Sequence, residues 1–179
     1  IPAGTFKVRS NDSDYRFRPH TAFSWLTGIG GSDAVPDSVL ILEPSGSSHE
    51  SLLFIHPRSP RERSDEFYRN PRHGEFWIGR RMTLDESQLV YGITVRHIDS
   101  LDDFLASERE TFIIRGEDNY IDSRIKENNG DEDLASWVSE ARLVKDEYEI
   151  MEMRKAIDAT HRGFEDMIKQ IPSAIGKKR

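Results

Sequence analysis

Apolar residues along the chain gather in short runs and in spaced stripes, and this pattern predicts strands that alternate with helices. Two continuous apolar runs, residues 39–42 and 52–55, are typical of strands buried on both faces. The segment between them, residues 43–50, is rich in Pro, Gly and Ser, which is a turn composition. The two runs therefore predict a hairpin or neighbouring strand pair in the middle of a sheet.

Other segments are also predicted to be strands. Residues 22–26 alternate aromatic and small side chains, residues 93–98 alternate apolar and polar ones, and residues 111–114 form a short apolar run. Residues 1–4 are expected to be the end of a strand that begins earlier. The glycine-rich segment 28–31 ends the strand expected at residues 22–26.

Helices are expected between these strands. Ser100 is expected to cap one helix, and Asp118 a second one that ends at residues 128–130. One or two helical turns are expected at residues 134–138, and residues 66–69 form either a short helix or part of a surface loop. The alternation predicts an α/β fold with a mixed central sheet flanked by helices.

The end of the chain predicts one long amphipathic helix. Its apolar stripe consists of Ile150, Met153, Ile157, Phe164 and Met167, which follow at three- and four-residue steps with Thr160 filling the gap in the series. Asp146 and Glu149 form an acidic version of the capping box, and Pro172 and Gly176 are expected to end the helix. Because such a stripe needs a surface to pack on, we expect part of it to have no partner within this chain.

Composition narrows the classes of function. The 179 residues, 36% of them apolar, suit one domain, or one domain plus a piece of another. The net charge of −7 argues against nucleic acid as a partner, because a nucleic-acid binder needs a basic face. The lack of cysteine excludes disulfides and thiolate metal sites, and no apolar run approaches a membrane helix. We expect a cytoplasmic protein with no membrane partner, trimmed at its amino end because it begins at Ile1.

The residues alone indicate no catalytic group and no metal site. None of the histidines forms the His-Glu-x-x-His arrangement. His161 and Glu165 lie one helical turn apart, which favours a solvated helix face over a metal pair. Asp12 and Asp14 resemble the start of a calcium loop, but the later ligand positions lack the required Gly and Glu.

The motif at residues 76–81, Phe-Trp-Ile-Gly-Arg-Arg, has two interpretations. Trp77 either packs on the sheet beside two surface arginines, or it belongs to a recognition edge in which an aromatic wall and cations meet carboxylates. Composition does not choose between these interpretations.

The segment from Arg9 to Gly28 resembles the aminopeptidase P amino-terminal domain. That family begins with acidic-x-Tyr/Phe-x-Phe/Tyr-Arg, followed by an aromatic strand ending in Leu-Thr-Gly. Three further segments agree in the same order: the two apolar runs, the motif at residues 76–81, and residues 142–150. The chain is thereby identified as similar to the creatinase and prolidase family.

This resemblance implies a division into two parts. Residues 1–142 would be the amino-terminal domain, with its first helix and strand trimmed. Residues 143–179 would be the linker and the first helix of a truncated catalytic pita-bread domain. In the family that second domain holds two metal ions, usually manganese, on two Asp, one His and two Glu. The present chain is then a non-catalytic, inactive domain with no cofactor of its own, serving oligomerisation and substrate-cleft formation.

The resemblance also implies site residues and partners. Trp77 would project toward a substrate cleft, often that of a neighbouring subunit, and Asp12 and Asp14 would face the catalytic domain. Arg81 would border the same cleft. The parent enzyme would release the first residue of peptides whose second residue is proline, and would form a homo-oligomer, either a dimer or a tetramer.

Two other interpretations stay open. The chain could be the amino-terminal domain of a prolidase, which cuts only dipeptides, although Asp14-Tyr15-Arg16-Phe17-Arg18 favours aminopeptidase P. It could also belong to a pseudo-peptidase that binds peptides or histones. The mixed rather than blocked charges argue against that module.

Overall fold

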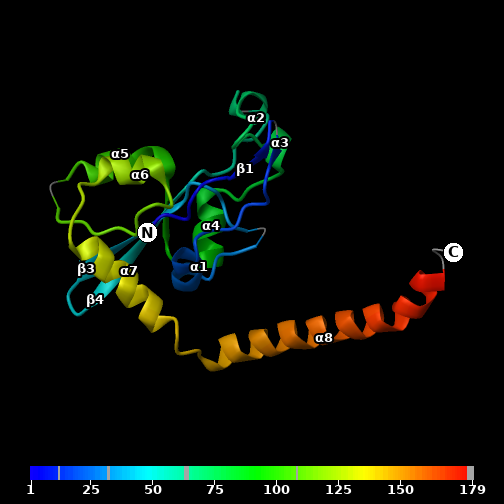
Figure 1. The fold of residues 1–179 in the computed structure, drawn as a ribbon. Coiled ribbons are helices and arrows are strands. Elements are labelled where there is room, and N and C mark those ends of the chain that lie inside the picture. Colours follow the sequence, from blue (N-terminus) through cyan, green and yellow to red (C-terminus); the bar gives the residue numbers. More distant parts are fainter. Residues whose placement is uncertain (12, 32, 63–64, 108, 177–179) are drawn as a thin grey trace. The chain divides into compact units, whose positions relative to one another are not determined.

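The computed structural model describes residues 1–11, 13–31, 33–62, 65–107 and 109–176 (Figure 1), and a small three-stranded sheet carries the core of residues 1–139. The strands lie in the order β3 (Val39–Ser45), β4 (Ser48–Ile55) and β5 (Thr94–His97). The first two are antiparallel, and β5 runs parallel to β4. The sheet is therefore mixed, as the sequence predicted.

The two apolar runs form a hairpin, which confirms the strand pair. Leu40 of β3 lies opposite Leu53 of β4, and Leu53 lies opposite Val95 of β5. Burial on both faces holds for the last four residues of β4. It fails for Leu42, which is 38% exposed. The strand predicted at residues 93–98 is confirmed by β5.

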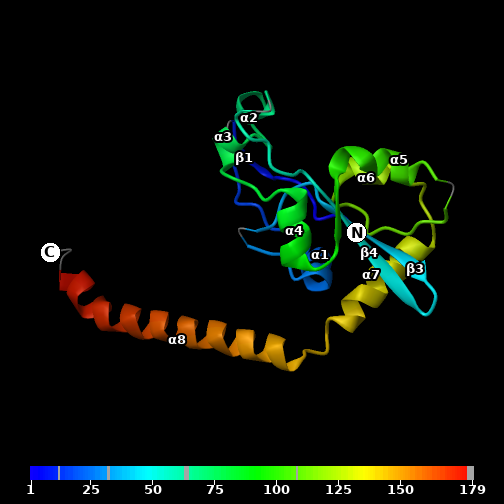
Figure 2. The ribbon, with the colours of Figure 1, turned by 180° about the vertical axis from the view of Figure 1, so that it is seen from behind.

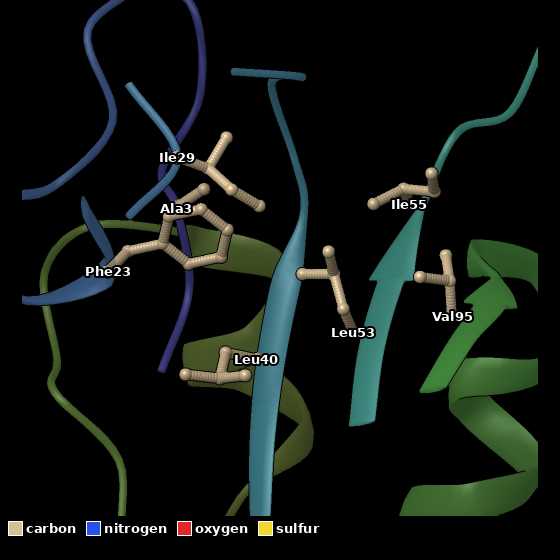
Figure 3. Packing of buried hydrophobic residues seen from close by; sticks show 7 residues of the cluster. All are labelled: Ala3, Phe23, Ile29, Leu40, Leu53, Ile55 and Val95. Carbon is tan, nitrogen blue, oxygen red and sulfur yellow. The ribbon is translucent and has the colours of Figure 1, made fainter. Parts of the chain in front are cut away.

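One face of the sheet packs against the amino-terminal part of the chain. Leu40, Leu53 and Val95 form a row across the three strands, and their side chains join Phe23 and Ile29 in one buried cluster (Figure 3). Leu84 and Tyr91, at the two ends of α4 (Leu84–Tyr91), pack on the same cluster. Helices therefore cover this face of the sheet.

The opposite face carries Val39, Leu52 and Phe54, which alternate with the first set along the strands. These side chains pack on Leu101 of α5 (Leu101–Leu105) and Ile121 of α6 (Asn119–Arg124). Helices α5 and α6 lie side by side in both views (Figures 1 and 2). Burial of both faces between helices confirms the predicted α/β fold class.

The strand predicted at residues 22–26 is wrong, because this segment is the helix α1 (Thr21–Thr27). Ala22, Phe23 and Leu26 share one face at helical spacing, and the first two are buried. Gly28 ends the helix at φ 70°, where its N–H donates to the Ser24 carbonyl at 2.8 Å. The same residues that alternate between aromatic and small side chains therefore also fit a helical period, which the prediction of a strand overlooked.

The strand predicted at residues 111–114 is also wrong. The Ile113 N–H donates to Asp131 Oδ1 at 2.8 Å instead of to a neighbouring strand. Asp131 lies in the first turn of α7 (Gly130–Ala141), so Gly130 begins this helix rather than ending α6. Residues 1–4 contribute a single antiparallel bridge, between Pro2 and Val39.

The other predicted helices are confirmed, although one cap differs. The Asp118 side chain accepts hydrogen bonds from the Tyr120 and Ile121 N–H groups, as predicted. The Ser100 hydroxyl instead donates to the His97 carbonyl at 2.7 Å, so it does not cap α5. The remaining short elements are β1 (Val8–Ser10), β2 (Ser13–Asp14), α2 (Glu66–Arg69) and α3 (Glu75–Ile78).

The residues divide into two compact units, Ile1–Ser139 and Glu140–Arg179. The second unit consists mainly of α8 (Glu147–Gly176), which begins with the predicted capping box between Asp146 and Glu149. Pro172 lies inside this helix, so the prediction that it ends the helix is wrong. Most of the predicted apolar stripe is exposed. No helix in the described part of the chain has the length and apolar content that a membrane span requires.

The central strand sets the stability of the first unit. Leu53 is 0% exposed and touches neighbours on both sides of its row, so Leu53→Ala should lower the free energy of unfolding by about 2–5 kcal/mol. Leu89 of α4 is 85% exposed, so Leu89→Ala should change the free energy of unfolding by less than about 0.5 kcal/mol. Urea denaturation of both variants measures the difference, and equal losses would contradict the assignment of the core.

Candidate functional site

Asp37 is the centre of a polar cluster beside the sheet. Its backbone has φ 63°, an uncommon value for a residue other than glycine, and its N–H donates to the Gly4 carbonyl at 2.9 Å. The two carboxylate oxygens of Asp37 accept from Arg72 Nε and Nη2, each at 2.8 Å. This bidentate pair fixes both oxygens in one geometry.

Two histidines extend the cluster. His73 is buried and places Nε2 3.1 Å from Asp37 Oδ2, while its Nδ1 lies 3.3 Å from Nη1 of Arg81. The ring of His56 stacks on the ring of His73, with centroids 3.7 Å apart. Since Arg81 can only donate, His73 Nδ1 accepts and Nε2 carries the proton that points toward Asp37.

Asp37, His56 and His73 are the one group among the described residues whose ligand atoms approach within 4.8 Å of one another, as a metal site would need. The chemistry of the trio does not suit a metal ion. Both Asp37 oxygens are held by Arg72, and the two ring nitrogens of His73 face Arg81 and Asp37, so His73 has no free lone pair for an ion. We therefore interpret the cluster as a hydrogen-bonded network.

The pKa values follow from burial and from the charges within this cluster. Burial alone would raise the pKa of Asp37, but hydrogen bonds from His73, Arg72 and Thr5 lower it below its ordinary range. Burial, together with the electrostatic effects of His73 and Arg81, lowers the pKa of His56 from 6.5 to about 3. His56 is therefore neutral at physiological pH.

Four aromatic side chains form a second feature, the aromatic patch, on α2 and α3. It consists of Phe67, Tyr68, Phe76 and Trp77, whose rings contact one another at centroid distances between 4.7 and 6.2 Å. The indole N–H of Trp77 donates to the Tyr68 carbonyl at 2.9 Å, yet the side chain is 58% exposed. One edge of Trp77 is thus anchored while the rest of the ring faces solvent.

The residues predicted to border a cleft differ in their exposure where the structure describes them. Trp77 and Asp14 are exposed, whereas Arg81 is 8% exposed and lies inside the domain. Asp12 lies outside the described residues. The interpretation with two surface arginines is wrong for Arg81, because its backbone N–H binds the buried Glu75 carboxylate at 3.0 Å and draws the residue inward. Arg80 is exposed and pairs with Glu86 at 2.6 Å.

Sequence patterns do not predict the cluster around Asp37. Asp37 and Arg72 are 35 residues apart, and neither belongs to a recognisable motif. A weak signal existed, since Asp is among the residue types that tolerate positive φ, and Asp37 follows Pro36. That signal indicates a turn but not its partners.

Known proteins are similar to this chain in sequence, and they indicate its family. The family model described as "Aminopeptidase P, N-terminal domain" matches residues 1–112. Xaa-Pro aminopeptidase 1 of Streptomyces coelicolor is 41% identical over 181 residues, covering 97% of this chain and 35% of the relative. Xaa-Pro aminopeptidase 2 of the same organism is 37% identical, covering 98% of this chain and 37% of the relative. The chain thus spans about a third of the length of these curated relatives.

Solved structures share the fold. Proline aminopeptidase P II from Yersinia pestis has a TM-score of 0.64 at 24% identity, covering 87% of this chain and 37% of that one. Aminopeptidase P from E. coli, in a low pH form, has a TM-score of 0.51 at 23% identity, and the match covers 69% of this chain and 26% of that one.

The cluster around Asp37 should make stability depend on acid. The pKa of His56 is about 3 when folded and about 6.5 when unfolded. The stability supplied by neutral His56 is therefore complete above pH 6.5 and is lost as the pH falls toward 3. The lowered pKa of Asp37 adds a second loss only below about pH 4.

His56→Gln removes this titration, so the free energy of unfolding should fall less steeply between about pH 6.5 and 4.5 than in the wild type. The slope should change by about 1 kcal/mol per pH unit or less. Water partly screens this half-buried ring, which limits the size of the change. Urea denaturation across this range gives the slope. His49→Gln, which changes an exposed histidine on β4, should keep the wild-type slope. Parallel slopes for the His56 variant and the wild type would refute the assignment.

Proposed function

The chain belongs to the aminopeptidase P amino-terminal domain family, and from this premise we propose that it is the non-catalytic amino-terminal part of a Xaa-Pro aminopeptidase. The observation that carries the proposal is the family match over residues 1–112, joined to Xaa-Pro aminopeptidases that align with 97–98% of the chain. The parent protein would remove the first residue from peptides whose second residue is proline.

The metal ions of such a parent would be held elsewhere. The family's site needs two Asp, one His and two Glu, holding two manganese or similar ions. The described residues of this chain offer one candidate trio, with a single carboxylate that Arg72 already holds. This set does not fit, so the role proposed for the chain is structural, in assembling the cleft and the oligomer.

Trp77 is the residue proposed to reach the cleft. An indole anchored through its N–H and exposed over most of its surface is a rigid wall, which can contact a peptide at little cost in conformational entropy. Asp14 is exposed, which suits the proposal that it and Asp12 face the catalytic domain. Arg81 is buried, so in this proposal it would lie behind the wall of the cleft and not on its surface.

The exposed stripe of α8 supports a further partner, the parent's own catalytic domain. Ile157, Phe164 and Met167 are all more than half exposed, although water disfavours such a surface. The curated relatives are about three times as long as the chain, which provides sequence to cover the stripe. Assembly into a dimer or tetramer, and a cytoplasmic location, belong to the same proposal.

The division of roles is tested by hydrolysis of an Xaa-Pro-Xaa tripeptide in the presence of Mn²⁺. The full-length protein should release the first residue, and the 179-residue chain alone should release none, because its described residues do not bring together the family's ligand set. Turnover by the chain alone would contradict the proposal. If neither protein hydrolyses the tripeptide, the result would favour a pseudo-peptidase.

The role of Trp77 is tested in the full-length protein. Trp77→Ala should lower kcat/KM for the tripeptide about tenfold or more, because the rigid wall of the cleft is lost. Trp137→Ala on α7 is a matched control, since that indole is 64% exposed and has no proposed contact with substrate. The two variants should unfold at similar temperatures, and equal kinetic effects would remove the special role of Trp77.

A further inference from the structure

A pocket of about 340 Å³ lies within the first unit, apart from the aromatic patch. Its lining includes Phe6 and Phe17 from the amino-terminal segment, Ile55 at the end of β4 and Ile78 at the end of α3. Arg81 and Ser87 also line it. The size lies at the lower end of the range for small-molecule sites.

Three buried side-chain atoms of residues that line this pocket have no hydrogen-bond partner in the described structure. They are Nε and Nη2 of Arg81 and Oγ of Ser87. Arg81 is 8% exposed and Ser87 is 1% exposed, so water does not readily satisfy these groups. Buried donors without partners are rare and cost free energy, which makes two such residues at one pocket a signal of a missing partner.

The unpartnered atoms of Arg81 form one functional unit. The N–H groups of Nε and Nη2 point in the same direction and can bind both oxygens of one carboxylate. The chain contains an example of this bond, because Arg72 uses the same two atoms to hold Asp37 at 2.8 Å. The third nitrogen of Arg81, Nη1, already faces His73. The free fork is therefore shaped for one further carboxylate.

Asp33 also lines this pocket but does not hydrogen-bond Nε or Nη2 of Arg81, and two further carboxylates near Arg81 are engaged elsewhere. Glu75 accepts the backbone N–H of Arg81 and lies 3.5 Å from Arg58 Nε, while Glu66 accepts a hydrogen bond from Asn70. Their negative charges favour a charged Arg81 against the opposing effect of its burial. Neither occupies the fork, although both help to keep it cationic.

We propose that this pocket binds a small monocarboxylate with a short apolar tail. Both carboxylate oxygens would accept from Nε and Nη2 of Arg81, with the Ser87 hydroxyl as an additional donor. The side chains of Phe17, Ile55 and Ile78 would enclose the tail. This site is independent of the peptidase assignment, because it rests only on groups inside this domain.

The experiment is a titration of the ¹⁵N-labelled 179-residue chain with sodium butyrate, observing the arginine Nε–H signals. The Arg81 signal, assigned by its loss in Arg81→Lys, should shift and saturate with butyrate, and should not respond to sodium chloride at equal ionic strength. Butyrate should bind more tightly than acetate, by about fourfold for each methylene enclosed. It should also bind more tightly than inorganic phosphate, which lacks an apolar tail.

Variants locate the site. Arg81→Lys keeps the charge but removes the fork, so thermal stabilisation by butyrate should need about tenfold more ligand. Arg69→Lys is the matched control, because Arg69 is exposed, pairs with Asp65 and does not line this pocket, and it should bind as the wild type does. If Arg81→Lys fails to fold, Ser87→Ala and the wild-type Nε–H signals carry the test. Equal responses to butyrate, phosphate and chloride, or wild-type binding by a folded Arg81→Lys, would overturn the proposal.

Discussion

The bond between Arg72 and Asp37 is the contact on which the arrangement of the first unit depends. Asp37 precedes β3, holds Gly4 through its backbone and holds Arg72 and His73 through its carboxylate. It therefore ties the amino-terminal segment and the chain leading into α3 to the same end of the sheet. A positive φ at a residue other than glycine costs about 1–3 kcal/mol, and these hydrogen bonds offset that strain. The positions of Trp77 and Arg81 follow from this junction, because both come shortly after His73.

Local patterns were sufficient to predict much of the fold. The strands β3 and β4 are continuous apolar runs whose burial follows from lying in a covered sheet, and β5 alternates as a strand should. The caps at Asp118 and Asp146 were also predictable, because a side chain that binds backbone groups two or three residues away needs no distant partner. The family motifs could also be recognised from the sequence, because each is a short stretch of consecutive residues.

Several of the failures involve partners that are distant in the sequence. Residues 111–114 look like a strand, but Asp131 takes the Ile113 N–H that would have entered a ladder. Residues 22–26 form a helix because one helical face reaches the core that Leu40 and Leu53 create. The cluster of Asp37, Arg72 and His73 joins two segments 35 residues apart, and the burial of Arg81 depends on Glu75 turning inward. Side-chain chemistry alone does not reveal such pairings, and the candidate site was therefore less predictable than the sheet.

Gly79 accounts for the opposite surroundings of the two functional candidates in one motif. It has φ 88° and ψ 174°, a conformation that other residues rarely adopt, and it separates Trp77 from Arg81. Before it, α3 presents an anchored and exposed indole; after it, the chain brings Arg81 against His73 and Glu75. A substitution at Gly79 would have to change the chain direction between these residues, even though a Cβ would find open space there. The backbone at Gly79, rather than the identities of the side chains alone, therefore gives this short motif one exposed indole and one buried guanidinium.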